Sequence, residues 1–374
     1  MSQQPLSILH VVPRLNRGGG GASVLHEWAA TREAVTPAFL SLERDVDVSM
    51  LREAMRRRIR VHVAPPAEEE ASLLQGADVV VVHFWQCPSL FHFCKRLQGR
   101  KLRLILYSRV RGTTPPQILH PALLALADGW ISTAPAELPF HGPQLWMPAL
   151  IDPALATAGP PARPASPFVV AHCNTLSASK MHPDLAALHE GHEVEVFGVG
   201  GDEAALAAFP HLRLQGFVAK WWSATRAQVL GHPLHPATSS SSDKVVQEAM
   251  FAGLPVLLLA PTGLGALVGD AAQVAPDAGA YRGALDRLAG DLAWRKRWAD
   301  AGLSHAHAHL HPHKNALRLF DFYTAIRSSP ATEKAFPVTV PDYLATVHPA
   351  AAPGMAAWHL DHAEGGRHHW AKWT

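Results

Sequence analysis

Short apolar runs alternate with longer amphipathic segments along the first half of the chain. The chain opens with an apolar run at 7–12, a glycine-rich loop at 13–23, and then Val24, Leu25 and Trp28 at helical spacing. Strand, glycine loop and helix in this order are typical of the start of a βαβ unit. Further apolar runs predict strands at 38–42, 61–64, 78–83, 102–107 and 130–133. Because these runs are almost continuously apolar, they indicate a parallel sheet that is buried on both faces.

The pattern breaks in a stretch rich in Pro, Ala and Gly and then restarts. The second half predicts strands at 168–172, 193–198, 212–214, 233–235 and 255–259, and a closing helix at 315–326. We therefore expect an α/β protein with an N-terminal Rossmann-like domain at 1–152, a linker at 153–167, a second Rossmann-like domain at 168–328 and a Pro/His/Trp-rich tail at 329–374. Two such domains are expected to face each other across a ligand-binding cleft.

Composition excludes several classes of protein. The 374 residues are 48% hydrophobic with a net charge of +2, which argues against a disordered chain and a dedicated nucleic-acid binder. The three cysteines have no CxxC spacing, so neither a disulfide framework nor a thiolate zinc site is predicted. No apolar run approaches the ~18 residues of a membrane span. We expect a cytoplasmic protein without a nucleic-acid partner.

Two features of the charged and titratable residues have alternative interpretations. Basic residues gather at 56–60 and 95–103, where they are either solvated helix ends or attract anionic lipid headgroups. The second interpretation predicts a peripheral contact with the inner face of a membrane. Five of the 24 histidines alternate at 305–313 and would share one face if extended, a spacing that can bind zinc or nickel. No Cys, Asp or Glu accompanies them, so no metal site is predicted.

Two stretches are candidates for binding a phosphorylated ligand. Gly18–Gly21 precedes a predicted helix, and backbone N–H groups there can approach a phosphate. The more specific stretch is 239–256, where a serine-rich loop leads into a helix with Glu248 and then into Gly253-Leu-Pro255 and a strand. It resembles the donor-binding motif of the group 1 (family four) retaining glycosyltransferases of the GT-B fold, E-x7-E followed by A-M-A-x-G-x-P-V.

The resemblance continues in the same order along the chain. Other segments similar to motifs of that family lie at 8–22, 78–83, 127–132, 147–152, 176–180, 196–200, 216–218 and 262–268. The resemblance implies that Lys180 and the N–H groups of Gly18–Gly21 stabilise a departing diphosphate. It also implies that Glu248 binds the ribose hydroxyls and that 216–218 lines the base pocket. The donor would be a nucleotide diphosphate sugar, and neither a metal nor another cofactor would be needed.

Several positions depart from the family pattern. The first Glu of E-x7-E falls on Ser240, the Arg of "G-R-L" on Thr175, the Glu of "G-G-x-x-E" on Ala266, and the usual His near Ser108-Arg109. Arg109 or Arg111 could restore the missing cation, and Asp243 the missing acid. His83, at the end of a strand, is either a structural histidine or a group that orients the acceptor.

The resemblance implies a retaining, metal-independent glycosyltransferase of the hexosyltransferase type, acting in the assembly of a glycan or glycoconjugate. The acceptor would be a glycan, a lipid-linked glycan or a small molecule. The alternative is a catalytically altered GT-B protein that serves as a non-catalytic binding or scaffold subunit. The predicted site consists of the catalytic residues Lys180, Arg109 and His83 and the donor-binding residues Gly18, Gly19, Gly20, Gly21, Thr175, Gly198, Gly216, Phe217, Ser240, Asp243 and Glu248.

Overall fold

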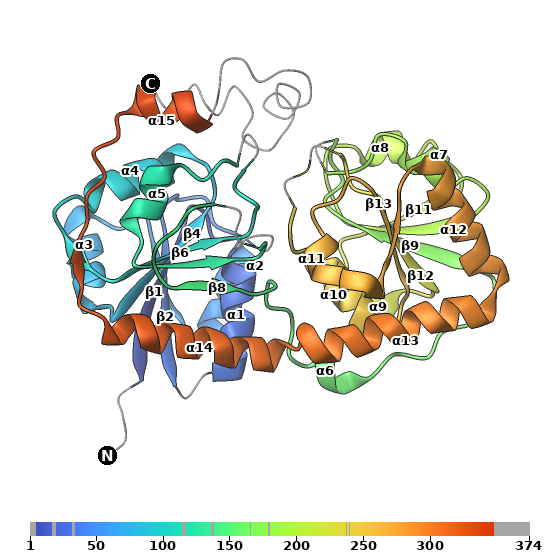
Figure 1. The fold of residues 1–374 in the computed structure, drawn as a ribbon, viewed down its shortest axis with the longest axis horizontal. Coiled ribbons are helices and arrows are strands. Elements are labelled where there is room, and N and C mark those ends of the chain that lie inside the picture. The colour runs from blue at the N-terminus through green and yellow to red at the C-terminus, as the bar shows by residue number, and fades with distance from the viewer. Residues whose placement is uncertain are drawn as a thin grey trace. The chain divides into compact units, whose positions relative to one another are not determined.

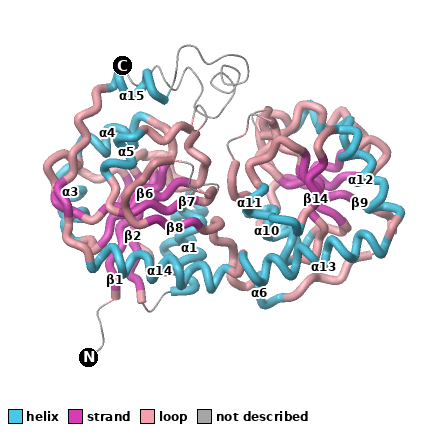
Figure 2. Tube along the Cα trace, viewed as in Figure 1, coloured by secondary structure: helices cyan, strands magenta, loops and turns pink. Residues whose placement is uncertain are grey.

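The chain folds into two compact units. The computed structural model describes residues 5–16, 20–31, 34–113, 117–135, 138–164, 166–178, 180–236, 238 and 240–347. Unit 1 contains the chain up to Leu150 and again from Pro312, and unit 2 runs from Ile151 to His311. In each unit helices surround a central sheet (Figures 1 and 2).

The main sheet of unit 1 is parallel and has the strand order of a Rossmann fold. From edge to edge it contains β3 (Arg60–Val63), β2 (Val35–Ser41), β1 (Leu6–Val12), β4 (Val79–Phe84), β6 (Leu104–Ser108), β7 (Gly129–Ser132) and β8 (Gln144–Trp146). The order reverses between β1 and β4. A reversal of this kind creates a crevice at the carboxyl ends of the two strands, where ligands of such sheets bind.

Both faces of this sheet are covered. Along β4, Val79 and Val81 pack in one apolar cluster and Val80 and Val82 in another, as the alternation of a strand requires. The helices of unit 1 are α1 (Gly20–Thr31), α2 (Val48–Arg56), α3 (Ala67–Gly76), α4 (Pro88–Arg96), α5 (Pro121–Leu126), α14 (Pro312–Ser328) and α15 (Val340–Val347). Burial of both faces explains why the strands are nearly continuous apolar runs.

Unit 2 repeats the same strand order. Its parallel sheet contains β11 (Leu212–Gly216), β10 (Glu193–Phe197), β9 (Val169–Cys173), β12 (Val229–His232), β13 (Val256–Leu259) and β14 (Gln273–Ala275). Its helices are α6 (Leu155–Ala158), α7 (Leu185–Leu188), α8 (Glu203–Leu206), α9 (Trp221–Ala224), α10 (Lys244–Phe251), α11 (Gly265–Val268), the 3-10 helix η1 (Gly269–Ala271), α12 (Ala278–Gly290) and α13 (Leu292–His309). Here the order reverses between β9 and β12.

The structure corrects the predicted end of the second domain. The closing helix at 315–326 lies within α14, which belongs to unit 1 and not to the second domain. Its buried residues Leu319, Tyr323 and Ile326 pack with Ile8 of β1, and α14 runs beside α1 (Figure 1). The apolar face of this helix therefore completes the core of unit 1.

Part of the predicted tail also belongs to unit 1. Strand β15 (Thr332–Glu333) pairs antiparallel with β5 (Lys101–Leu102), and the buried Lys334 ammonium donates to Asp128. Tyr343 of α15 is buried, and its hydroxyl donates to Gln86 Oε1 at 3.1 Å. The predicted linker also has structure, because it contains α6.

The strand predicted at 233–235 is displaced. The observed strand is β12, which ends at His232, just before Pro233. Proline has no N–H to donate to a neighbouring strand. The central strand of the sheet is therefore formed by the apolar residues that precede Pro233. Among the described residues, no helix combines the length and apolar character needed to cross a bilayer.

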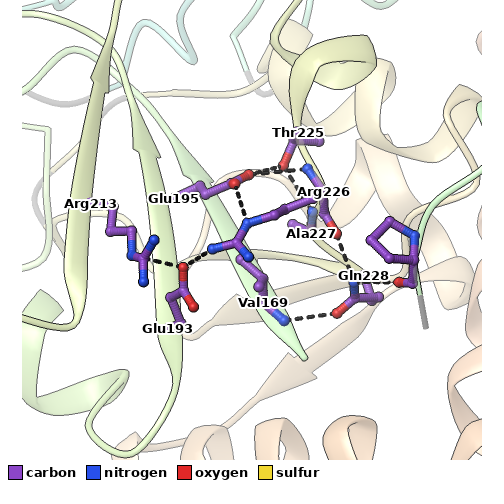
Figure 3. Close-up of polar contacts among 9 residues, drawn as sticks. Val169, Glu193, Glu195, Arg213, Thr225, Arg226, Ala227 and Gln228 are labelled. Atoms are coloured by element: carbon purple, nitrogen blue, oxygen red, sulfur yellow. Dashed lines mark hydrogen bonds and ion pairs between the residues drawn. The ribbon is translucent and has the colours of Figure 1, made fainter. Parts of the chain in front are cut away.

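A polar cluster stabilises unit 2 at the end of the sheet opposite the candidate site (Figure 3). The buried Glu195 carboxylate accepts from the Thr225 hydroxyl at 2.6 Å and from Arg226 Nε at 3.0 Å. Arg226 also pairs with Glu193, to which the more exposed Arg213 donates at 2.8 Å. The guanidinium of Arg226 thus compensates a carboxylate that would otherwise be buried with only neutral partners.

Arg226→Ala is expected to lower the free energy of unfolding of unit 2 by about 2 kcal/mol, because it leaves Glu195 buried without a cation. Arg213→Ala is the matched control, since Arg213 forms a solvent-exposed pair that contributes less than about 1 kcal/mol. Urea unfolding of the two variants measures the difference. Equal losses in both would contradict this account of the cluster.

Candidate functional site

Three loops meet at the carboxyl edge of the unit 2 sheet. They follow β9, β10 and β11 and are joined by backbone hydrogen bonds. Leu176 N–H donates to the Val199 carbonyl at 3.1 Å, and Gly198 N–H donates to the Gly216 carbonyl at 2.9 Å. Thr175 is exposed in the first loop, and Phe217 is 53% exposed in the third. These contacts bring together the predicted donor-binding positions Thr175, Gly198, Gly216 and Phe217.

Two of these glycines are required by the backbone. Gly198 has φ +137°, and a Cβ there would lie 1.8 Å from the Asn174 carbonyl oxygen. Gly216 has φ +68° with open space around it. L side chains rarely adopt such φ values, so both turns depend on glycine. The turn at Gly198 holds the loop after β10 tightly against the loop after β9.

Asp243 lies at the same edge, at the N-terminus of α10, and is held by two side chains. His232 Nε2 donates to Asp243 Oδ2 at 3.0 Å, and the Ser240 hydroxyl donates to Oδ1. Burial opposes the negative charge, but these hydrogen bonds and the Lys180 ammonium outweigh it and lower the pKa of Asp243. The carboxylate is therefore charged at neutral pH. Ser240, where the family pattern has a glutamate, serves here as a partner of Asp243.

Glu248 is anchored by a tryptophan that sequence reasoning missed. Trp221 Nε1 donates to Glu248 Oε2 at 2.6 Å. Burial raises the pKa of Glu248, opposed by the Trp221 hydrogen bond and the Lys244 charge. Trp221 begins the helix that follows the Phe217 loop, so one side chain links the predicted base-binding loop to the predicted ribose-binding carboxylate. No sequence signal pointed to Trp221, because its hydrogen bond to Glu248 joins segments that are distant in the sequence.

In unit 1, Arg109 and His83 meet at the corresponding sheet edge. Arg109 follows β6 directly, and its Nη1 donates to His83 Nδ1 at 2.9 Å. His83 Nε2 lies 3.0 Å from His10 Nδ1, so both ring nitrogens of His83 are engaged. His83 is also only 2% exposed. It can therefore influence a substrate only through Arg109, which makes it a positioning residue.

The buried polar contacts of unit 1 continue to Glu27. His10 Nε2 lies 4.0 Å from Glu27 Oε1, and the Tyr323 hydroxyl donates to Glu27 Oε2 at 3.3 Å. Burial and then the Arg109 charge lower the pKa of His10 to about 3. Burial raises the pKa of Glu27 to about 8, against the opposing effects of Tyr323 and Arg109. Neither His10 nor Glu27 was among the predicted site residues.

The predicted glycine loop is described only in part. Gly18 and Gly19 lie outside the described residues. Gly20 begins α1, and Gly21 is buried where a Cβ would lie 2.8 Å from Leu15 Cδ1. A Cβ at Gly21 would thus require the end of the Leu15 side chain to shift.

The alternating histidines do not share one face, because they lie at the end of α13 and beyond it. In a helix the neighbours are four apart, and His305 contacts His309 with ring centroids 4.8 Å apart. His305 Nε2 also contacts the Leu267 carbonyl at 2.9 Å. Among the described residues, no group of three or more His, Cys, Asp or Glu side chains is placed to hold a metal ion.

Known structures share the fold of two Rossmann-like units. Sucrose-phosphate synthase from Thermosynechococcus elongatus matches with a TM-score of 0.66 and 17% identity, over 86% of this chain and 99% of its own. HepE from Anabaena, in complex with UDP and glucose, matches with a TM-score of 0.66 and 14% identity. The match covers 86% of this chain and 100% of the HepE chain. WaaG, a glycosyltransferase involved in lipopolysaccharide biosynthesis, matches with a TM-score of 0.59 and 12% identity. The match covers 85% of this chain and 99% of the WaaG chain.

The chain has the GT-B fold. No protein-family model matches its sequence, and no curated protein does either. At such low identities the GT-B likeness concerns the arrangement of the backbone, so activity must be argued from this chain's own residues. Those residues are Lys180, Asp243 and Glu248 in unit 2 and Arg109 in unit 1.

Proposed function

We propose that this GT-B protein is a retaining glycosyltransferase that transfers a sugar from a nucleotide diphosphate sugar to an acceptor hydroxyl. The observation that carries the proposal is the edge of the unit 2 sheet, where a tight glycine loop adjoins a cation and two anchored carboxylates. Such an edge, at the point where the strand order reverses, suits a nucleotide. Solved structures of HepE with UDP and with UDP-glucose support the choice of ligand.

Each residue of unit 2 has a proposed role. Glu248, oriented by Trp221, would accept hydrogen bonds from the ribose hydroxyls, and Phe217 would cover the base. Lys180 would stabilise the charge that develops on the diphosphate as the glycosidic bond breaks. Asp243, charged and fixed by His232, would bind sugar hydroxyls in place of the glutamate that the family pattern has at Ser240.

Unit 1 would contribute the acceptor side and one further cation. Arg109 would compensate for the arginine that the family pattern has at Thr175. We propose that no metal or other cofactor takes part, since Lys180 and Arg109 supply the positive charge. The proposed setting is glycan or glycoconjugate assembly in the cytoplasm, and the basic clusters of unit 1 would support a peripheral membrane contact.

The proposal is tested with a panel of nucleoside diphosphates and nucleotide diphosphate sugars. At least one nucleoside diphosphate is expected to raise the melting temperature, and its sugar conjugate to be hydrolysed slowly without acceptor. Glu248→Ala is expected to weaken that binding by about 1–3 kcal/mol, because ribose hydroxyls lose a charged partner. The exposed Glu333→Ala is the matched control. Absence of binding across the whole panel would refute the proposal.

The same panel separates the enzyme from a scaffold subunit. The observation that favours a scaffold is that Ser240 is committed to Asp243 where the family pattern has a glutamate. A non-catalytic protein would bind a nucleoside diphosphate without cleaving any sugar conjugate.

A further inference from the structure

A row of buried polar side chains lies beneath Arg109 in unit 1. The members of this row, which we call the Arg109 row, are Arg109, His83, His10, Glu27 and Tyr323. His10 of β1 and His83 of β4 project to the same face of the sheet, and their ring centroids are 5.3 Å apart. Glu27 comes from α1 and Tyr323 from α14, which packs beside it. Five distant segments of sequence thus supply one continuous row.

The row has a fixed hydrogen-bond direction. A guanidinium can only donate, so His83 Nδ1 must accept and carries no proton. The proton of neutral His83 is then on Nε2, which donates to His10 Nδ1. By the same reasoning the proton of neutral His10 is on Nε2, which faces Glu27. One donor-only side chain therefore determines both imidazole tautomers.

The directed hydrogen bonds end at His10. Its Nε2 lies 4.0 Å from Glu27 Oε1, beyond hydrogen-bond distance, while Glu27 Oε2 accepts from the Tyr323 hydroxyl. Among the residues that the structure describes, the titratable groups that face the row are its own members and Tyr107, whose ring centroid lies 4.2 Å from the Arg109 guanidinium carbon. Burial and the Arg109 charge lower the pKa of both histidines, so neither competes with Arg109 for positive charge.

If packing were the only role of this row, it would lower the stability of the folded state relative to apolar side chains at the same positions. Buried polar groups gain little net stability over apolar side chains of similar size, and a buried ionisable group costs more. The neighbouring positions on this face are Ile8, Val81 and Ile105, which pack without polar contacts. The hydrogen bond from Arg109 and its stacking on Tyr107 together restrict where the guanidinium can point.

We propose that His10 and Glu27 are positioning residues for Arg109, whose guanidinium they hold in the orientation that binds an anionic group of the substrate at the edge of the unit 1 sheet. His83 connects them, because its Nε2 contacts His10 and its Nδ1 accepts the hydrogen bond from Arg109. This inference rests on the proposed function for the identity of the anion, whereas the orientation of Arg109 can be tested without turnover. A guanidinium that is already held in the binding orientation loses no further conformational freedom when the anion binds, so the reaction includes no free-energy cost for ordering it.

The first test measures the tautomers directly. In protein labelled with 15N-histidine, the ring nitrogen shifts are expected to show His10 and His83 as neutral Nε2–H tautomers at pH 7. Arg109→Met is expected to shift the His83 resonances and to leave those of His172, a buried histidine of unit 2, unchanged. A proton on Nδ1 of His83, or no response to Arg109→Met, would overturn the proposal.

The second test uses matched substitutions and steady-state kinetics. His10→Leu removes the acceptor for His83, whereas His10→Asn keeps one near the position of Nδ1. Donor hydrolysis is expected to fall about tenfold in kcat for His10→Leu and less than about threefold for His10→Asn. Glu27→Gln, which keeps the shape of an uncharged acid, is expected to retain more activity than Glu27→Ala. Equal kcat in His10→Leu and His10→Asn at equal melting temperature would refute positioning.

Nucleoside diphosphate binding distinguishes the two possible failures. That binding depends on unit 2 and is expected to be unchanged in all four variants. If the unsubstituted protein binds no nucleoside diphosphate, the proposed function fails, and the nitrogen shifts still decide whether the row fixes Arg109. If it binds and hydrolyses a donor but the variants do so equally well, the positioning proposal alone fails.

Discussion

Lowering the pH from 7 to 5 is expected to destabilise unit 2 by about 4 kcal/mol through two buried histidines. Burial lowers the pKa of His172 to about 3 and that of His189 to about 4. Their rings are held by neutral partners, since His172 Nδ1 contacts the Gly231 carbonyl and His189 Nε2 contacts the Tyr281 hydroxyl, each at 3.0 Å. A domain with a typical stability of about 5–15 kcal/mol would lose a large fraction of it.

The sign of this effect follows from proton binding. In the unfolded chain a histidine takes up a proton as the pH falls through about 6.5, whereas the folded rings remain neutral down to about 3 or 4. The unfolded state therefore binds more protons than the folded state between pH 7 and pH 5, and the free energy of unfolding decreases as the pH is lowered. Each ring accounts for about 2 kcal/mol at pH 5. The raised pKa of Glu248 acts in the opposite direction and offsets part of the loss.

Unit 1 is expected to lose less stability over the same range. His10 and His83 act in the same direction as the histidines of unit 2. The pKa of Glu27, however, is raised to about 8, so its ionisation in the unfolded chain costs stability at pH 7. That cost is about 3 kcal/mol at pH 7 and less than about 1 kcal/mol at pH 5. Acidification therefore removes most of the Glu27 cost, and this gain offsets the stability lost through one of the two histidines.

Urea unfolding at pH 7 and pH 5 measures these effects. His172→Asn keeps a donor for the Gly231 carbonyl but does not titrate, so it should lose about 2 kcal/mol less than the unsubstituted protein between the two pH values. His92→Asn, at an exposed position of α4, is the matched control and should not change the pH dependence. An identical pH dependence for His172→Asn and the unsubstituted chain would contradict the expected burial of a neutral ring.

Much of the fold could be predicted because both sheets are buried on two faces. Uniformly apolar strands such as β4 and β13 are visible as short runs, and the Pro-rich break marks the change of unit. The assignment of α14 could not be predicted, because an amphipathic helix shows which face it buries but not against which sheet. The small edge strands β5 and β15 were missed because two residues carry no periodicity.

Residues of the candidate site could be predicted where the sequence matches motifs of the family that it resembles. Gly198, Gly216 and Glu248 were predicted from the resemblance to family motifs. Trp221, His10 and Glu27 could not be predicted, since their roles depend on contacts between segments far apart in sequence. The histidines show this most clearly. The conspicuous alternating ones lie in an ordinary helix end, whereas the isolated His10, His83 and His232 contact the candidate residues.

Lys180→Ala is expected to reduce donor turnover by two to three powers of ten, roughly the effect of removing one group that stabilises transition-state charge. The backbone of Lys180 is fixed on both sides, since its N–H donates to the Ser177 carbonyl at 2.9 Å and its carbonyl accepts from His235 N–H at 2.9 Å. Its ammonium lies close enough to Asp243 to lower the pKa of that carboxyl. Two backbone hydrogen bonds therefore hold Lys180 at the sheet edge where the diphosphate is proposed to bind.

The kinetic pattern distinguishes a catalytic lysine from one that only binds. If Lys180 acts mainly on the charge that develops during bond cleavage, kcat falls and KM changes little, because the interaction strengthens in the transition state. A rise in KM with unchanged kcat would show instead that Lys180 binds donor and transition state equally. Lys296→Ala, on the exposed surface of α13, is the matched control and should leave both constants unchanged. Full turnover in Lys180→Ala would remove this cation from the proposed mechanism.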